Sequence, residues 1–334
     1  MESQSRGRVL LLGATGTIGR ATHRVLLASG WSVTCLGRNN PVAGADWVFC
    51  DMASQPSVLA AMRQAVQAVQ VGPMEQGVQM GQPLAIVSCM ASRTGVPADA
   101  WAIDHDAHQH VLKAACALGV RQFVLLSAIC VQKPRLAFQQ AKLAFEQSLM
   151  GSGLTYSIVR PTAFFKSLTG QIDRVRSGKP YLVFGDGRLT ACKPISDEDL
   201  ADFIAGCLTD PARFNRILPI GGPGPAITPL QQAEQLFATL GRPVKIRSVP
   251  PALLDGIVGV LGLLGRLVPA LAAKAELARI GRYYATESML VWNEALQAYD
   301  AQATPETGTH TLFDFQARLA RGEVEVARGD HAVF

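Results

Sequence analysis

The chain has few charged residues, few aromatic residues and no long uninterrupted apolar run. Charged side chains make up 17% of its 334 residues and aromatic ones 7%, whereas an average soluble domain is about 25% charged. The net formal charge is only +5. This composition argues against a disordered chain and against a dedicated nucleic-acid binder. No uncharged apolar run reaches the ~20 residues that a bilayer-spanning helix needs, and the length predicts one large domain or two modest ones.

The cysteines are odd in number and no two have C-x-x-C spacing. They are Cys35, Cys50, Cys89, Cys116, Cys130, Cys192 and Cys207. This pattern gives little support to a disulfide framework, a zinc ribbon or an iron–sulfur cluster. Because most of them lie inside apolar strings, we interpret them as small buried hydrophobic residues in a reducing compartment.

Short apolar strands alternate with helices over the first half of the chain. The expected strands are 9–12, 31–36, 47–50, 84–88, 123–126 and 156–159, and the expected helices are 17–29, 57–69, 107–118 and 136–150. Apolar strands separated by helices predict a parallel sheet covered on both faces, which is a doubly wound α/β fold of the Rossmann type.

The pattern loosens after Pro161. A helix over 195–210, capped by Ser196 and Asp197, and a strand over 218–220 are still expected, and then a smaller, mostly helical part. Residues 71–83, rich in Gly, Pro and Gln, predict a surface loop. We expect a cofactor-binding domain over 1–165, completed by about 190–222, and a substrate-binding part made of 166–189 and 223–334.

A glycine-rich string follows the first expected strand and opens the first helix. Gly13 permits a tight turn, Gly16 lets the backbone approach a diphosphate at the helix N-terminus, and Gly19 allows close packing of helix and strand. Thr15, Thr17 and Ile18 belong to the same loop. The order of strand, glycines, helix and next strand predicts a dinucleotide site, and the GxxGxxG spacing is typical of short-chain dehydrogenase relatives.

Arg38 stands where an acidic residue would bind the ribose 2′-hydroxyl of NADH, about 20 residues beyond the glycines. A cation there favours the 2′-phosphate of NADPH; the alternative is a solvated loop arginine. Asp51, with Met52 beside it, follows the third strand and is a candidate adenine contact. Its alternative role is a helix N-cap.

Half of the usual short-chain dehydrogenase constellation is missing. Ser127 follows the fifth strand and Lys142 lies on the next helix, but Phe138 occupies the position of the usual tyrosine four residues earlier. Residues i and i+4 share a helix face, so Phe138 would enter the site without an ionisable proton. Alcohol–ketone chemistry then lacks its usual acid, whereas hydride addition to a conjugated carbon–carbon double bond does not need it. Loss of catalysis is the alternative.

Two further features have plainer interpretations. The Asp104–His110 string resembles a metal cluster, but a solvated helix start explains it better, and His23 is expected on a helix surface. The most apolar stretch, 253–273, is interrupted by Asp255, Arg266 and Pro269. We interpret it as a core or substrate-lid helix, with a peripheral membrane contact as the minority alternative.

Three strings resemble the divinyl (proto)chlorophyllide 8-vinyl reductases, atypical short-chain dehydrogenases of chlorophyll and bacteriochlorophyll synthesis. They are VSCMASRTGVPADAWAIDHDA, FVLLSAICVQKPRLAFQQAKLAFE and YSIVRPTAFFKSLTGQIDRVRSGKPYLVFGDGRLTACKPISDEDLA. The resemblance spans about residues 8–250 and concerns the form without iron–sulfur clusters. It implies a Mg-tetrapyrrole substrate, NADPH as reductant and reduction of the 8-vinyl group to ethyl. Hydride would reach the terminal vinyl carbon, the charge would spread into the macrocycle, and a proton would follow at the inner carbon.

The resemblance also implies roles for individual residues. Gly13, Gly16, Gly19 and Arg38 would bind the NADPH phosphates, Ser88 and Cys89 would line the cofactor, Lys142 would hold ribose hydroxyls, and Pro161 and Thr162 would border the nicotinamide. Phe138, Phe164, Phe165 and Lys166 are the expected substrate side, the last as a cation for the propionate; ordinary core is the alternative for Phe164 and Phe165. Ser127, Lys142 or water would supply the proton, and no metal site is expected.

Two other functions are compatible with this fold. One is an NADPH-binding regulator or photosystem assembly factor without turnover, and the other is an isoflavone-reductase-like enzyme acting on a small phenolic double bond. We expect a cytoplasmic protein, with a location peripheral to photosynthetic membranes as the variant of that prediction, and no nucleic-acid partner.

Overall fold

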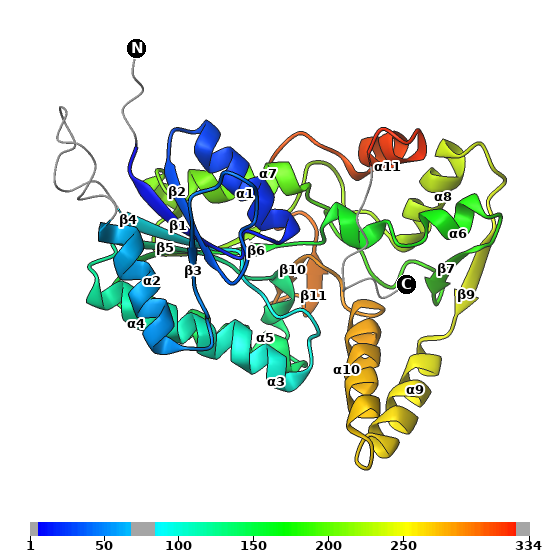
Figure 1. The fold of residues 1–334 in the computed structure, drawn as a ribbon. Helices are drawn as coiled ribbons and strands as arrows, with labels where there is room; N and C mark the ends of the chain where they lie inside the picture. The colour runs from blue at the N-terminus through cyan, green and yellow to red at the C-terminus, as the bar shows by residue number, and fades with distance from the viewer. Residues whose placement is uncertain (1–5, 68–83, 325–334) are drawn as a thin grey trace.

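The computed structural model describes residues 6–67 and 84–324, and its central layer is a seven-stranded sheet (Figure 1). The strands follow the order β3-β2-β1-β4-β5-β6-β8, and every pairing is parallel. Their bounds are β1 (Arg8–Leu12), β2 (Ser32–Gly37), β3 (Trp47–Phe49), β4 (Leu84–Ser88), β5 (Gln122–Leu126), β6 (Thr155–Pro161) and β8 (Arg216–Ile220). The predicted doubly wound α/β fold is confirmed.

Helices cover both faces of this sheet. In Figure 1, α1 (Thr17–Ala28) and α7 (Asp197–Gly206) lie above it, and α2 (Gln55–Gln67), α4 (His108–Ala117) and α5 (Ala137–Met150) lie below it. Alternate residues of β1 enter opposite cores, since Leu10 and Leu12 face α2 and α4 whereas Val9 and Leu11 face α1 and α7. All four are fully buried, and each such side chain contributes about 1.5–3 kcal/mol by its burial.

Two local predictions about helix ends have different outcomes. Ser196 caps α7 as expected, because its hydroxyl accepts a hydrogen bond from the Asp199 amide at 3.0 Å. The helix expected over 107–118 begins earlier than predicted, with α3 (Pro97–Ala100) and a π-helical turn, η1 (Trp101–Ala107), leading into α4. The loop expected at 71–83 lies outside the described residues.

His23 is not a surface residue, contrary to the sequence prediction. It lies on α1 and is buried, because α7 packs over that helix. Burial, assisted by the neighbouring charge of Arg24, lowers its pKa. The interpretation of the cysteines is confirmed for five of the seven, which are free and buried; Cys89 is half-buried and Cys116 is exposed.

The second part of the chain is mostly helical, but it also contains two small sheets. The strands β7 (Tyr181–Phe184) and β9 (Ile246–Val249) pair in parallel, and β10 (Val291–Asn293) and β11 (Ala298–Asp300) form an antiparallel hairpin. Strands of three or four residues carry too short a pattern for the sequence to reveal. The helices α6 (Ile172–Arg176), α8 (Pro229–Thr239) and α11 (Leu312–Ala320) share a separate core with β7.

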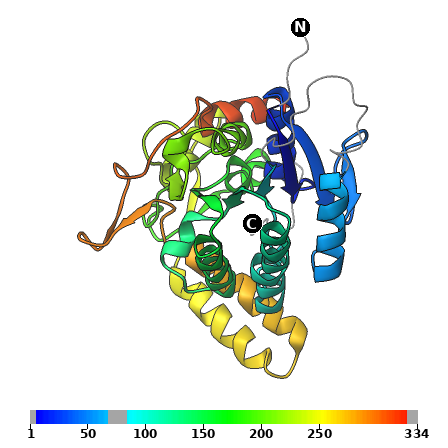
Figure 2. The same ribbon diagram turned by 90° about the vertical axis from the view of Figure 1, so that its left-hand side faces the viewer.

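Two further helices, α9 (Pro251–Leu264) and α10 (Pro269–Tyr284), form a hairpin that projects from the body in both views (Figures 1 and 2). The base of α10 is anchored to the region after β5, since the Tyr283 hydroxyl donates to the Cys130 carbonyl at 3.0 Å. None of the described helices is long and apolar enough to cross a membrane.

Candidate active site

The loop after β1 has the geometry of a phosphate cradle. Gly13 has φ +74°, and a Cβ on it would lie 2.6 Å from the carbonyl carbon of Cys89. A Cβ on Gly19 would lie 2.1 Å from the carbonyl oxygen of Gly13. A Cβ on Gly16 would meet nothing closer than 3.4 Å. The protein itself therefore requires glycine at positions 13 and 19, whereas the space beside Gly16 remains open to a ligand.

The N-terminus of α1 is open toward the same space. Gly16 is its N-cap and provides no side-chain cap, and the first turn contains no acidic residue. Thr15, Gly16 and Thr17 are exposed, while Ile18 is buried against the core. Uncapped first-turn amides and the positive end of the helix dipole suit an anion. These features fit the diphosphate of a dinucleotide.

The carboxyl ends of β1, β2 and β4 meet at one edge of the sheet. Leu12 is in register with Leu36 and with Ser88. Arg38, two residues beyond Leu36, therefore emerges beside the phosphate loop, and its side chain is exposed. This position is the one at which a dinucleotide's adenosine ribose lies in a Rossmann fold.

Asp51 lies beside that edge, but it does not cap a helix. Its Oδ1 accepts a hydrogen bond from the Ala53 amide at 3.1 Å, outside the helix. The side chain that caps the N-terminus of α2 is that of Ser54, whose hydroxyl accepts a hydrogen bond from the Ser57 amide at 3.3 Å. The alternative role of Asp51 as an N-cap is therefore wrong. The adjacent Met52 is half-buried, and its carbonyl lies 3.0 Å from Nδ1 of His110.

Ser88, at the end of β4, is paired with a buried histidine. His108 Nδ1 lies 2.8 Å from the Ile103 carbonyl, which can only accept, so this nitrogen carries the hydrogen. Burial, and then the charge of Lys142, lowers the pKa of His108 to about 4. The neutral ring therefore accepts at Nε2 from the Ser88 hydroxyl, 2.8 Å away. This contact fixes the strand end that faces the phosphate loop.

Lys142 is held by an acid that the sequence analysis placed in solvent. Its Nζ lies 2.8 Å from Oδ1 of Asp104, whose other oxygen accepts from the Ser92 hydroxyl at 2.7 Å. Asp104 is buried on the π-helical turn η1, so the predicted solvated helix start is wrong. π-helical turns inside helices are frequent at functional sites. Asp104 and His108 are four residues apart and share a helix face. In the sequence, this spacing was the one indication that the two side chains belong to a buried network.

Ser127 belongs to a different buried network on the same sheet edge. Its hydroxyl donates to Oε1 of Glu146 at 2.5 Å, and Glu146 also forms an ion pair with Arg160. Ser127 and Glu146 are both buried. The single proton of Ser127 is thus directed at a carboxylate, whereas Lys142 has three protons and gives one to Asp104.

The end of β6 lies at the same edge of the sheet. Pro161 is in register with Ile220 of β8, and the next residue, Thr162, directs its hydroxyl to the Lys193 carbonyl. Cys89 lies opposite, beyond β4, with its sulfur 3.7 Å from the Thr22 hydroxyl. Burial raises the pKa of the Cys89 thiol to about 12, with the Thr22 contact opposing that shift. A thiol protonated at neutral pH does not act as a nucleophile.

The three phenylalanines differ in exposure. Phe138 and Phe164 are half-buried, and Phe138 packs in the cluster that also contains Ile280. Phe165 is 4% exposed, and its ring centroid lies 5.4 Å from that of Phe315. The ordinary-core alternative therefore describes Phe165, which has little surface left for a ligand.

Lys166 lies at the phosphate loop. Its Nζ is 3.3 Å from the hydroxyl of Thr17, the first residue of α1. Asp197 is a further neighbour, and Oδ1 of that carboxylate is buried without a hydrogen-bond partner among the described residues. Burial and the nearby Glu198 raise the pKa of Asp197 to about 6, although the positive charges of Lys166 and Arg24 oppose this.

Comparisons with known proteins place this chain in an NAD(P)H-binding family. A family model described as NAD(P)H-binding matches residues 13–211. The chloroplastic divinyl chlorophyllide a 8-vinyl-reductase of Zea mays is 45% identical over 350 residues, which cover 99% of this chain and 84% of that protein. The photosystem II assembly factor Ycf39 of Cyanophora paradoxa is 27% identical, over 74% of this chain and 73% of that protein.

Solved structures show the same fold at low sequence identity. The NADPH-dependent quinone oxidoreductase QOR2 of Escherichia coli, solved with NADPH, superimposes with a TM-score of 0.62 at 18% identity. The match covers 93% of this chain and 99% of that one. At this identity the comparison concerns the arrangement of the backbone alone.

Proposed function

Because the chain belongs to the divinyl chlorophyllide a 8-vinyl-reductase family, we propose that it reduces the 8-vinyl group of a divinyl (proto)chlorophyllide to an ethyl group with NADPH. The observation that carries the proposal is the 45% identity across 99% of the chain. When bound, NADPH supplies a hydride to one vinyl carbon; a proton completes the other carbon, and NADP⁺ leaves. The protein's contribution is to place a flat pigment against the nicotinamide and to exclude water.

The cofactor half of the site is formed by the edge of the sheet. We assign to it the phosphate loop and the residues at or just beyond the carboxyl ends of β2, β3, β4 and β6, together with Lys142 for the ribose hydroxyls. The full set is Gly13, Thr15, Gly16, Thr17, Ile18, Gly19, Arg38, Asp51, Met52, Ser88, Cys89, Lys142, Pro161 and Thr162. The open space at Gly16 and the uncapped first turn of α1 support this assignment.

Lys166 fits the cofactor better than the substrate. Its ammonium is directed at the first residue of α1, where the diphosphate would lie. A lysine at a helix N-terminus adds a full positive charge to the partial charge of the helix. We therefore reassign it from the pigment's propionate to the diphosphate.

Lys142 is the better supported source of the proton. Its ammonium is 12% exposed and keeps donors beyond the one given to Asp104, whereas the Ser127 proton is committed to Glu146. Ser127 then acts as a positioning residue that ties the end of β5 to α5. Phe138 and Phe164, both half-buried, remain the aromatic surfaces proposed for the macrocycle.

The proposed function also suggests how the chain is divided between cofactor and pigment and where the enzyme works. We propose that 1–165 and about 190–222 hold the cofactor, and that 166–189 and 223–334 form the pigment-binding part. Since the pigment is a largely apolar tetrapyrrole, the enzyme would work in the aqueous compartment but in peripheral contact with photosynthetic membranes.

The decisive experiment is a mass measurement. The purified chain is incubated with divinyl chlorophyllide a and NADPH, and the pigment is expected to gain two hydrogens. A parallel sample with the double variant Asp104→Asn/Lys142→Met, which leaves no buried unpaired charge, is expected to lose most of this conversion while the protein stays folded. NADPH binding without any gain of mass would contradict the proposal and favour the regulator or assembly factor. Reduction of a small phenolic substrate in place of the pigment would favour the isoflavone-reductase-like alternative.

A further inference from the structure

The α9–α10 hairpin concentrates the exposed apolar side chains of the molecule. Among the described residues, nine of the eighteen large exposed apolar side chains lie between 253 and 284. We define the hairpin tip as Val260, Leu263, Leu264, Leu267 and Val268; Leu267 is 84% exposed and Leu263 63%. The tip lies at the end of a projection that points away from the sheet (Figures 1 and 2). Clustered apolar exposure of this kind marks an interaction surface.

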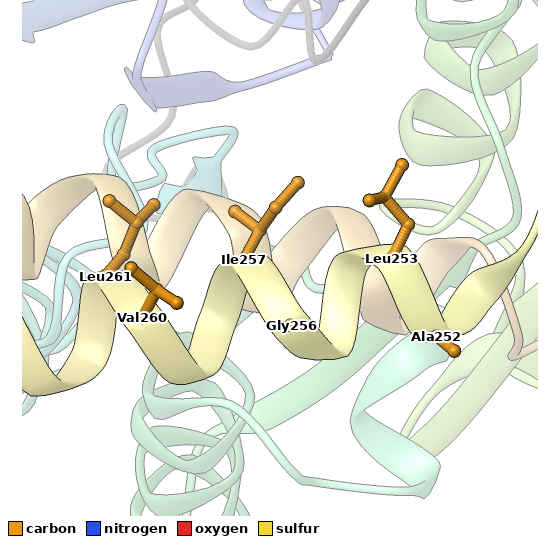
Figure 3. Close-up of a pocket in the computed structure, with 6 residues that line it drawn as sticks. All are labelled: Ala252, Leu253, Gly256, Ile257, Val260 and Leu261. Carbon is orange, nitrogen blue, oxygen red and sulfur yellow. The ribbon is translucent and has the colours of Figure 1, made fainter.

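The hairpin holds together without burying these side chains. A Cβ on Gly265 would lie 2.8 Å from the backbone of Ala272, so a glycine lets the helices approach where the chain turns. Asp255 of α9 forms an ion pair with Arg282 of α10 at 2.7 Å. No residue of α9 is buried. Figure 3 shows Leu253, Ile257 and Leu261 pointing the same way from α9, and together with Val260 of the tip they line an apolar hollow.

The free charge of the hairpin is positive. Its two acids are both neutralised inside it, Asp255 by Arg282 and Glu276 by Arg279 at 2.9 Å. Arg266 at the tip and Lys274 on α10 are exposed, and no ion pair involves either of them within the described part of the chain. Leucines flanked by uncompensated cations suit a surface that combines an apolar interior with anionic groups.

We propose that the hairpin tip docks the protein on the surface of a membrane that contains anionic lipids. The leucines would enter the boundary between headgroups and acyl chains, and Arg266 and Lys274 would meet the headgroups. With 14 residues, α9 is too short to span the ~20-residue thickness of a bilayer, so it can lie only at the interface. The inference rests on the proposed function for its purpose, which is access to a pigment dissolved in lipid.

A second copy of the chain fits the tip less well. A two-fold contact through the tips would bring Arg266 of one copy close to Arg266 of the other, and juxtaposed like charges oppose association. An anionic lipid headgroup would instead neutralise the charge of Arg266. Experiments that measure self-association and vesicle binding can therefore distinguish a second copy from a membrane.

Vesicle sedimentation tests the proposal on the full chain. Vesicles of phosphatidylcholine with phosphatidylglycerol are compared with vesicles of phosphatidylcholine alone. The double variant Leu263→Asp/Leu267→Asp is expected to bind the anionic vesicles at least about tenfold more weakly than the wild type. The reason is that it lacks the two apolar side chains whose burial in the lipid stabilises the bound state. Arg266→Glu should reduce binding to anionic vesicles more than to neutral ones. Leu296→Asp is the matched control: this leucine is 67% exposed on the β10–β11 turn, away from the tip, and its variant should bind like the wild type.

Three results would overturn the proposal. One is the absence of wild-type binding to anionic vesicles, and another is equal binding by the double variant. The third is a concentration-dependent dimer that the double variant dissolves, which would assign the tip to a second copy. Turnover of detergent-dissolved divinyl chlorophyllide and binding of NADPH are measured on the same preparations, and the double variant should keep the wild-type affinity for NADPH, which is held by the other part of the chain. Vesicle binding by a wild type that reduces no pigment would support the docking surface and contradict the proposed function.

Discussion

The ammonium of Lys142 and the Oδ1 of Asp104 lie 2.8 Å apart, and the pair joins α5 to the π-helical turn η1. The side chain of Asp104 is fully buried and that of Lys142 is 12% exposed. The ammonium of Lys142 is thus oriented by a carboxylate 38 positions away in the sequence. The hydroxyl and the amide of Ser92 both donate hydrogen bonds to the Asp104 carboxylate. These two bonds hold the carboxylate in place independently of its contact with Lys142.

Asp104→Asn should lower the free energy of unfolding by about 3 kcal/mol, because it leaves a nearly buried ammonium without its counter-charge. Urea denaturation measures this loss. The double variant Asp104→Asn/Lys142→Met should recover most of it, since no unpaired charge remains. Asp106→Asn is the control on the same helix, where the carboxylate is exposed and a change within about 0.5 kcal/mol is expected. Equal stability of the two single variants would contradict the interpretation.

Arg38→Ala should raise the KM for NADPH by about tenfold or more while changing the KM for NADH little. The physical reason is the loss of a charge-assisted contact to the 2′-phosphate, worth about 1.5–3 kcal/mol. Steady-state kinetics with both cofactors give the ratio. Arg216→Ala removes an exposed arginine at the amino end of β8, away from the cofactor edge, and should change neither constant. An equal rise in both constants for Arg38→Ala would refute a role at the phosphate.

Lys166→Ala should raise the KM for NADPH by about tenfold and leave the KM for the pigment unchanged, because its Nζ lies at the first residue of α1. Lys166→Arg should restore most of the affinity, since the positive charge is kept. Fluorescence titration with NADPH measures binding independently of turnover. A selective rise in the pigment KM would instead support the original prediction that Lys166 binds the propionate.

Phe138→Tyr should not increase turnover. The ring is half-buried in the apolar cluster that contains Ile280 and Tyr283, and a hydroxyl placed there finds no partner that the proposed chemistry requires. The rate of pigment reduction under saturating NADPH is the measurement. Phe49→Tyr, on an exposed residue of β3, controls for the substitution itself. A clear gain in turnover for Phe138→Tyr alone would mean that the missing phenol limits the reaction.

Acidification from about pH 6.5 to 4 should destabilise the protein through His108. Burial and the charge of Lys142 lower the pKa of His108 to about 4 from 6.5, so the unfolded chain takes up the proton first as the pH falls. The contribution to stability is present above pH 6.5 and is lost toward pH 4, with an upper limit of about 3 kcal/mol. The free energy of unfolding is measured from pH 6.5 to 4. Its decrease should be smaller for His108→Gln than for the wild type, and the control His105→Gln should behave like the wild type. Parallel curves for all three proteins would show that His108 does not contribute.

The elements of the Rossmann layer were predictable because each has a local signal. The apolar strand at residues 9–12 is buried on both faces, and Gly13 and Gly19 leave no room for a side chain at the strand–helix junction. The short strands of the second part were missed because three or four residues pair through contacts that their own pattern does not specify. Asp104 was misplaced for a related reason: burial of a carboxylate depends on a partner that the local sequence does not contain.

By itself, the sequence determined the parallel sheet, the phosphate loop, the family and the absence of a phenol at position 138, since periodicity, spacing and residue type are local properties. Only the tertiary structure decided which groups meet: Lys142 with Asp104, Ser127 with Glu146, and Lys166 with Thr17. These contacts join residues up to 149 positions apart. Their formation depends on how helices cross the sheet edge, and burial then sets which charges are paired and which protons are free.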